Sequence, residues 1–272
     1  MHRPVLVLGL MLAALALPAR ADEAEDLCAS AFDPPRIVAA CTTAIEEPVL
    51  RPSARARAHA LRGWARMRQE DRPGARADFN AALALDGDNV SALLGRGIVD
   101  GNDGKLDTAL ADFAQAQRLD PKNQAVFIDR AQVLLGQHRY AEALADAEFE
   151  RYGAGAGNTF LNLRCRARAY GGIDLDKARL VCDQALWLQP NLPVLLEARG
   201  IVALKQKRPE AALADFTALT NAQGQAARGW YGKALAETAL GRDGEAKADF
   251  ARARAINIKV DQMFADMGLA QG

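Results

Sequence analysis

The feature that most constrains this chain is a self-similarity that returns about every 34 residues. An alanine recurs with spacings of 34, 34, 35, 34 and 34 residues, as Ala75, Ala109, Ala143, Ala178, Ala212 and Ala246. Four residues after each alanine comes a position that is usually aromatic, reading Phe79, Phe113, Ala147, Cys182, Phe216 and Phe250. Aspartate precedes that position as Asp78, Asp112, Asp146, Asp215 and Asp249, and only Val181 breaks the column. One unit of this length cannot bury its apolar face alone, so we expect successive units to stack on a continuous core.

Within each repeat the apolar residues recur three and four positions apart, as in Leu106, Ala109, Leu110 and Phe113. This spacing predicts one face of an α-helix, and no stretch alternates as a half-buried strand does. Twelve residues before the recurring alanine, a preceding apolar block carries a small residue: Gly63, Gly97, Ala131, Gly200 and Ala234, with Ala167 one place out of register in the fourth repeat. Small residues on facing helices let their backbones approach closely, so we expect each repeat to be a pair of packed helices.

These residues resemble the tetratricopeptide repeat, a unit of two antiparallel helices with small residues where they cross. A large side chain near the start of the first helix matches at Leu93, Phe127, Leu196 and Trp230, and a late alanine of the second helix matches at Ala82, Ala116, Ala185 and Ala253. Pro121 and Pro190 close two units, whereas Gly87, Gly155 and Gly224 replace that proline elsewhere. The resemblance implies an all-α fold, an α-solenoid of stacked antiparallel hairpins in a TPR-like superhelix, with six repeats over residues 54–258.

The first 21 residues have the three regions of a secretory signal peptide. A basic start at His2 and Arg3 precedes an apolar run over residues 5–17, and small residues flank the cleavage expected after Ala21. The alternative is a membrane anchor, but 13 apolar residues of helix span about 20 Å, well short of a hydrocarbon core of roughly 30 Å. We therefore expect export, a periplasmic or secreted location, and no stable membrane insertion after cleavage.

Four cysteines allow three pairings if all of them are bridged. Cys28 and Cys41 lie symmetrically about the turn-forming residues 33–36, and Cys165 and Cys182 lie symmetrically about residues 171–174. Residues equidistant from a turn face each other across a helical hairpin, so the spacing predicts bridges Cys28–Cys41 and Cys165–Cys182. An oxidising compartment favours such bridges. The alternative, a redox or metal role, lacks any Cys-x-x-Cys motif.

Both ends of the repeat array have their own expected elements. Residues 22–53 are predicted to form a disulfide-pinned helical hairpin and a linker. At the other end Val260, Met263, Phe264 and Met267 have the spacing of an amphipathic helix, which predicts a capping helix within residues 259–272. The same apolar stripe could instead bind a partner or another copy of the chain.

Chemistry-bearing motifs are largely missing from the sequence. It contains no Gly-x-Ser-x-Gly, no phosphate-binding loop and no His-Glu-x-x-His motif, so we predict no catalytic residues, no cofactor and no metal. The acidic run over residues 100–105 departs from a calcium loop and is interpreted as a turn between helices. Equal numbers of basic and acidic residues, 34 of each, argue against a nucleic-acid partner.

The resemblance places one row of side chains from the first helices on the concave face. Its members are Trp64, Leu94, Ile98, Ile128, Gln132, Ile201, Tyr231 and Leu235. This largely apolar row predicts a groove for a peptide or helix of another envelope protein, with Trp64 and Tyr231 as its main contacts. The alternative, that these side chains are buried between neighbouring repeats, stays open, and Trp187 is interpreted as packing between repeats. We expect a non-catalytic adaptor; the alternative is a holdase-like carrier or accessory factor of an envelope assembly machinery, and self-association is left open.

Overall fold

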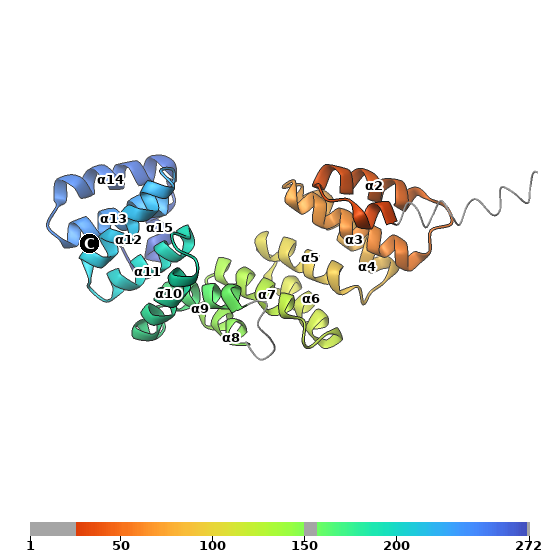
Figure 1. The fold of residues 1–272 in the computed structure, drawn as a ribbon, viewed down its shortest axis with the longest axis horizontal. Coiled ribbons are helices and arrows are strands. Elements are labelled where there is room, and N and C mark those ends of the chain that lie inside the picture. The colour runs from red at the N-terminus through yellow and green to blue at the C-terminus, as the bar shows by residue number, and fades with distance from the viewer. Residues whose placement is uncertain (1–25, 150–156, 271–272) are drawn as a thin grey trace, which may run out of the picture. The chain divides into compact units, whose positions relative to one another are not determined.

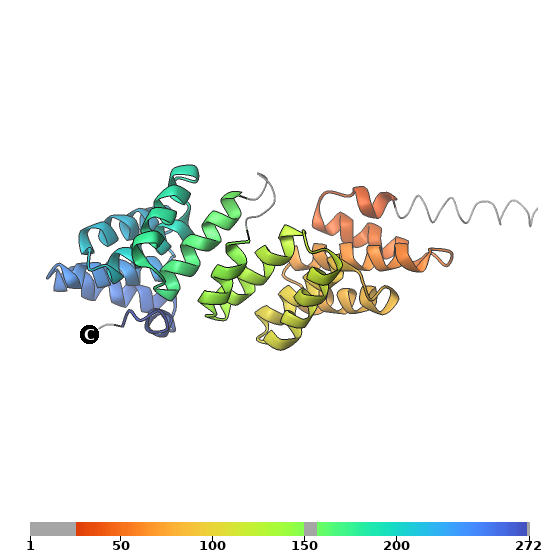
Figure 2. The same ribbon diagram turned by 90° about the horizontal axis from the view of Figure 1, so that it is seen from below.

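The computed structural model describes residues 26–149 and 157–270, and the regular structure within these ranges is entirely helical (Figures 1 and 2). The chain divides into two compact units, the first ending at Val126 and the second beginning at Phe127. Consecutive helices pack against each other in pairs along each unit, which confirms the predicted all-α stack of antiparallel hairpins. The predicted signal peptide, residues 1–21, lies outside the described residues. Among the described helices, none combines the length and apolar character that crossing a membrane requires.

The helices follow one another as pairs with short turns. The first unit contains α2 (Pro34–Glu46), α3 (Pro52–Arg68) with α4 (Arg72–Leu85), and α5 (Val90–Asn102) with α6 (Leu106–Leu119). Helix α7 (Gln124–Gly136) starts at the boundary between the units and is followed by α8 (Tyr140–Ala147). The second unit continues with α9 (Gly157–Gly171) and α10 (Leu175–Leu188), α11 (Pro193–Lys205) and α12 (Pro209–Ala222), α13 (Ala227–Ala239) and α14 (Asp243–Ile256), and α15 (Val260–Ala265).

Local chemistry explains where many of these helices begin. The side chains of Asp33, Asp71, Asn89 and Asp174 each accept a hydrogen bond from a backbone N–H in the first turn of the following helix. Such caps satisfy donors that have no partner inside the helix. Helices α2, α3, α11 and α12 have proline in their first positions, where its missing N–H costs nothing.

The turn inside each hairpin uses the same backbone conformation. Every turn has a residue with positive φ at an equivalent place, and these residues recur every 34 or 35 positions: Glu70 (63°), Gly104 (79°), His138 (59°), Gly172 (65°), Lys207 (57°) and Gly241 (73°). Glycine adopts this conformation without strain, whereas other residues pay for the crowding of their Cβ atom. The turn geometry is therefore fixed by the repeat and not by the residue that occupies it.

Two of the recurring phenylalanines, Phe79 and Phe216, are held between glycines of two successive hairpins. A Cβ atom added at Gly63 would lie 2.6 Å from the ring of Phe79, and one added at Gly95 would lie 2.2 Å from Cζ of the same ring. Phe216 has the same relationship with Gly200 at 2.8 Å and Gly232 at 2.3 Å. Both rings are completely buried. Each ring thus links the two helices of its own hairpin to the first helix of the next one.

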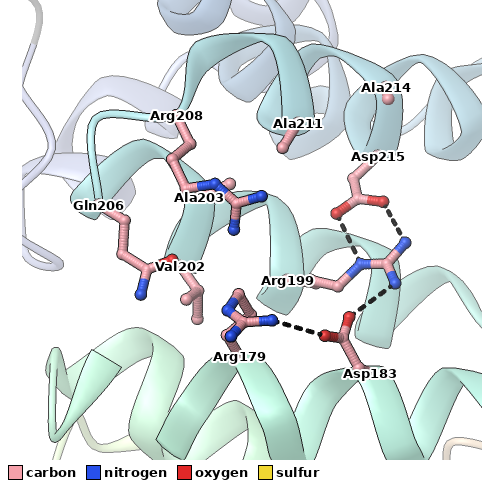
Figure 3. Close-up of a pocket in the computed structure, with 10 residues that line it drawn as sticks. All are labelled: Arg179, Asp183, Arg199, Val202, Ala203, Gln206, Arg208, Ala211, Ala214 and Asp215. Carbon is pink, nitrogen blue, oxygen red and sulfur yellow. Dashed lines mark hydrogen bonds and ion pairs between the residues drawn. The ribbon is translucent and has the colours of Figure 1, made fainter. Parts of the chain in front are cut away.

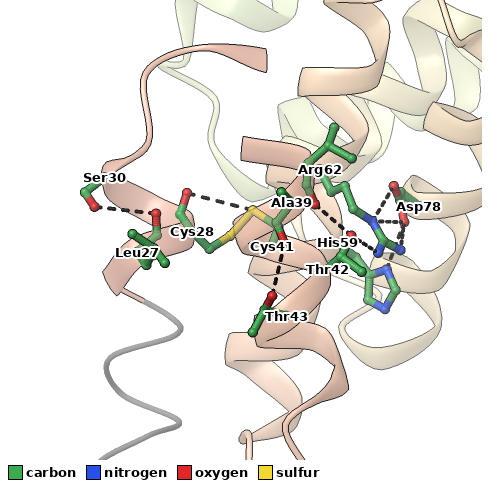
Figure 4. The surroundings of a disulfide bond; sticks show 11 residues. Leu27, Cys28, Ser30, Ala39, Cys41, Thr42, Thr43, His59, Arg62 and Asp78 are labelled. Carbon is green, nitrogen blue, oxygen red and sulfur yellow. Dashed lines mark hydrogen bonds and ion pairs between the residues drawn. A yellow bond between two sulfur atoms is a disulfide. The ribbon is translucent and has the colours of Figure 1, made fainter. Parts of the chain in front are cut away.

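Both predicted disulfides are present. Cys28 and Cys41 join residues 26–30 to α2, as Figure 4 shows, and Cys165 and Cys182 join α9 to α10. Cys182 stands at the position of the recurring phenylalanine. Cys165 lies 34 residues after Ala131 and 35 before Gly200, so it, and not Ala167, is the small residue of the fourth repeat. The extra residue of this repeat falls in the turn, where Gly172 and Asp174 both have positive φ. A covalent bond here replaces the contact between glycine and phenylalanine.

Helix α15 ends the second unit against the last hairpin. Val260 and Phe264 are fully buried and Met267 is 5% exposed. The ring of Phe264 lies 4.7 Å from that of Tyr231 on α13. The predicted apolar stripe therefore packs onto the chain itself, over a helix shorter than the predicted range 259–272.

Candidate partner-binding surfaces

A buried ion pair recurs in five of the described hairpins. A basic residue on the first helix, one position before the small residue, contacts the recurring aspartate sixteen residues later: Arg62–Asp78 (2.7 Å), Arg96–Asp112 (2.7 Å), Arg130–Asp146 (2.7 Å), Arg199–Asp215 (2.6 Å) and Lys233–Asp249 (2.5 Å). All five aspartates are buried residues. The basic residues recur with the same spacing as the aspartates, and this second repeating position was not among the predicted ones. These charges hold the two helices of a hairpin together.

The basic member of the pair also reaches back to the previous hairpin. Arg62 donates a hydrogen bond to the hydroxyl of Thr42 (Figure 4) and Arg96 donates one to the amide oxygen of Asn80. Arg199 instead donates to a carboxylate, that of Asp183 on α10, at 3.0 Å. Arg199 therefore joins two aspartates from successive second helices. Of the three contacts to a previous hairpin, this one alone involves a second charged side chain.

We call the side of each unit formed by the first helices of the hairpins its inner face, and the opposite side, formed by the second helices, its outer face. On the outer face a cavity of about 250 Å³ opens between α10 and α12, with α11 behind it (Figure 3). Its polar lining comes from Arg179 and Asp183 of α10, Arg199 and Gln206, and Arg208 and Asp215. A second cavity of about 330 Å³ adjoins Asp183 and Arg199 and is also lined by Leu186, Trp187, Pro190, Asn191 and Leu196. We call the two cavities together the outer crevice.

Trp187 lies at one end of the outer crevice, and its side chain is 79% exposed. The interpretation of Trp187 as packing between repeats is therefore wrong. The helix register that buries Cys182 and Ala185 turns residue 187 toward the outer surface of α10.

On the inner face of the first unit, the structure brings together three of the predicted groove residues. Trp64 and Ile98 are partly exposed, and Leu94 is 6% exposed. The indole Nε1 of Trp64 donates a hydrogen bond of 2.9 Å to the hydroxyl of Ser91 on the next first helix. Its ring meets Phe79 edge-on at 5.6 Å. Two large apolar side chains are therefore partly exposed here, and Trp64 is held in place by these contacts.

On the inner face of the second unit two of the five predicted row residues are closed off. Ile201 and Tyr231 are at most 1% exposed, because Tyr231 packs on Phe250 at 4.9 Å and is covered by Phe264 of α15. For these two side chains the alternative of burial inside the stack applies. Ile128 and Leu235 are partly exposed and Gln132 is exposed.

A polar cluster occupies the middle of that inner face. The guanidinium of Arg228 lies 2.6 Å from the carboxylate of Glu197, stands 5.1 Å from the ring centre of Tyr170, and contacts the sulfur of Met267. Arg166, which belongs to the row 34 residues after Gln132, interacts with Tyr170 and Glu197. Burial is the main cause that raises the pKa of both Glu197 and Tyr170. Arg166 is absent from the predicted row, because that row had no member from the fourth repeat.

Within the described residues, no group of three or more histidine, cysteine, aspartate or glutamate side chains is arranged to hold a metal ion.

The comparisons with known proteins identify the repeat. A family model described as tetratricopeptide repeat matches residues 60–99, 100–158 and 197–259, which together exceed half of the chain. No curated protein is significantly similar in sequence.

Solved structures share the fold at low sequence identity. A tetratricopeptide repeat protein from Parabacteroides merdae is 15% identical, with a TM-score of 0.66 over 94% of this chain and 98% of its own. PilW, a type IV pilus biogenesis factor, is 19% identical, with a TM-score of 0.66 over 77% of this chain and 96% of its own. The pilF protein of Pseudomonas aeruginosa is 15% identical, with a TM-score of 0.61 over 78% of this chain and 97% of its own.

Proposed function

We propose that this chain, which belongs to the tetratricopeptide repeat family, is an adaptor of the cell envelope that holds a partner protein on the inner face of its first unit. Proteins of this family are generally non-catalytic scaffolds that bind protein partners. The partner supplies a helix or peptide with apolar side chains, because Trp64 and Ile98 are partly exposed apolar side chains.

The envelope location is supported by two features of the chain. Both disulfides lie inside hairpins and leave no free cysteine among the described residues, as expected for a protein that folds under oxidising conditions. The signal-peptide pattern of residues 1–21 agrees with this location. Together they favour a periplasmic or secreted protein.

The observation that carries the binding site is the fixed orientation of Trp64. Its hydrogen bond to Ser91 and its edge contact with Phe79 hold the indole in one position. Binding of a partner therefore costs little side-chain conformational entropy at Trp64. Large aromatic side chains that are already ordered are frequent hot spots of protein interfaces.

The test uses the chain from Asp22 onward as bait in cell-envelope extracts, with chemical crosslinking and identification by mass spectrometry. The Trp64→Ala/Ile98→Ala variant is compared with Leu85→Ala, whose side chain is 41% exposed on α4. We expect one dominant partner that the double variant loses and Leu85→Ala retains. A partner retained by both variants would contradict the assignment to this face. Tyr231→Ala is unsuitable here because Tyr231 belongs to the core.

A second candidate function is that of a carrier or accessory factor in an envelope assembly machinery. The observation that favours it is the shared fold of PilW, a type IV pilus biogenesis factor, over 77% of this chain. The same experiment separates the two functions. A broad set of unrelated clients favours the carrier, and recovery of pilus components favours the accessory factor.

A further inference from the structure

Helix α10 exposes large apolar side chains at positions where the other repeats do not. Leu180 is 59% exposed and stands two residues before the recurring aromatic position, where the other five repeats have alanine: Ala77, Ala111, Ala145, Ala214 and Ala248. Trp187 stands five residues after that position, where the described repeats have Ala84, Arg118, Asn221 and Ala255, all exposed. The fold of the repeat therefore does not need a large apolar side chain at either place, and their presence on one helix points to binding.

Trp187 borders the outer crevice, which has an apolar end and a cationic end, and Leu180 lies two turns before it on the same face of α10. Trp187, Leu186 and Leu196 line the first end, and Arg179 and Arg208 line the second. Asp183 and Arg199 belong to both cavities and connect them. Eight residues of helix separate Arg179 from Trp187, which corresponds to about 12 Å along α10.

The charge of the crevice favours an acidic partner. Three arginines line the first cavity together with two aspartates, and both aspartates already accept hydrogen bonds from Arg199. Arg179 makes only a 3.4 Å contact with Asp183, and the exposed side chain of Arg208 forms no ion pair with another described residue. Two guanidinium groups at this end thus retain hydrogen-bonding capacity for carboxylates.

We propose that the outer crevice is a second docking surface, which binds an acidic amphipathic helix of a partner protein. One large apolar side chain of that helix packs against Trp187, and carboxylates two turns away lie between Arg179 and Arg208. A helix suits the site because α10 and α12 border the first cavity on two sides (Figure 3) and the second cavity continues along α10 to Trp187. This surface is separate from the inner face around Trp64 and does not depend on it.

The probe is a fluorescently labelled, alanine-rich helical peptide of 14 residues with leucine at position 4 and glutamate at positions 11 and 12. Its matched controls carry lysine in place of both glutamates, or carry both glutamates within one turn of the leucine. Binding to the full chain is measured by fluorescence anisotropy at low and physiological salt. We expect the first peptide to bind at least tenfold more tightly than either control, and added salt to weaken it.

The protein variants use substitutions that the repeat already tolerates. Trp187→Ala and Leu180→Ala restore the alanine found in other repeats, so the fold is expected to be unchanged, and Arg208→Glu reverses the charge at the other end. Each is expected to weaken the acidic peptide at least fivefold. Ile258→Ala, at a side chain that is 80% exposed, and Arg36→Glu in the first unit serve as controls that leave binding unchanged.

Equal binding of the acidic and basic peptides, or unchanged binding by Trp187→Ala, would overturn the proposal. A dimer in sedimentation experiments that Trp187→Ala abolishes would also overturn it, because the surface would then belong to a second copy of the chain. Since Trp64→Ala leaves this crevice intact, failure here is distinguishable from failure of the inner-face proposal.

Discussion

Gly95 on α5 lies directly against the ring of Phe79 on α4, and a Cβ atom at residue 95 would come within 2.2 Å of Cζ of that ring. The ring is completely buried and has Gly63 on its own hairpin, so it has little room to move. This contact joins the first hairpin to the second. It makes residue 95 a sensitive reporter of how tightly the hairpins stack.

We expect Gly95→Ala to lower the free energy of unfolding by about 1–3 kcal/mol, because the added methyl group overpacks the interface between hairpins. Gly136→Ala is the matched control, since a Cβ atom there meets nothing within 4 Å, and helix propensity should make it neutral or slightly stabilising. Urea unfolding followed by far-UV circular dichroism measures both. If Phe79→Leu does not relieve the effect of Gly95→Ala in the double variant, the ring is not its cause.

The turns offer a test of backbone strain without side-chain contacts. Gly104 has a φ of 79° and open space around its Cβ position, so Gly104→Ala should cost about 1–2 kcal/mol through the backbone alone. Lys207 occupies the equivalent turn at 57°, and Lys207→Gly should raise the free energy of unfolding by about 1 kcal/mol for the same reason. If both variants raised the free energy of unfolding, or both lowered it, the two turns would not share one conformation.

The sequence was sufficient to predict the architecture and the disulfides, because both follow from spacing. A constant interval places Ala75, Phe79 and their counterparts at the same point of every hairpin. Cysteines equidistant from a turn, such as Cys165 and Cys182, meet across it. Arg62 and its counterparts recur at the same interval as the aspartates. Comparison of the two sets of positions would therefore have predicted them as partners of the aspartates.

Exposure was harder to predict than architecture. Tyr231 has the position of a groove residue, but whether α15 covers it depends on how the chain turns after Asn257, which no period describes. The extra residue in the fourth repeat shifted the expected register from Cys165 to Ala167, and Arg166 was lost with it. Trp187 was misassigned because a large aromatic residue near a helix end was taken to pack between repeats, without reference to its position in the repeat. Comparison with Ala84 and Ala255 would have placed it outside.

The disulfide of the fourth hairpin can be tested against the packing that it replaces. Its cysteines are 17 residues apart, and such a loop corresponds to about 3 kcal/mol of stabilisation. Cys165→Ala/Cys182→Ala should lose this amount and additional packing, whereas Cys165→Gly/Cys182→Phe should recover part of the loss by restoring the contact seen at Gly200 and Phe216. Hydrogen exchange of α9 and α10 measures the local effect. Equal exchange in the two double variants would show that the phenylalanine does not fit this hairpin.

Asp129 gives the chain a specific pH dependence. It stands in the repeat position of Gly95 and Gly232, and burial raises the pKa of its carboxyl from 3.8 to about 6. An acid whose pKa is higher in the folded state binds its proton more tightly there, so its contribution to the free energy of unfolding falls as the pH rises from about 4 to 6. Above pH 6 the folded protein carries the full cost of a buried charge, at most about 3 kcal/mol.

Asp129→Asn should remove this dependence and stabilise the protein at pH 7, while leaving it little changed at pH 4. Denaturant unfolding at several pH values measures how the free energy of unfolding depends on pH in the parent protein and in the variant. Asp107→Asn, at an exposed residue, is the control. A variant whose stability follows pH as the parent does would show that Asp129 ionises as an exposed carboxylate does.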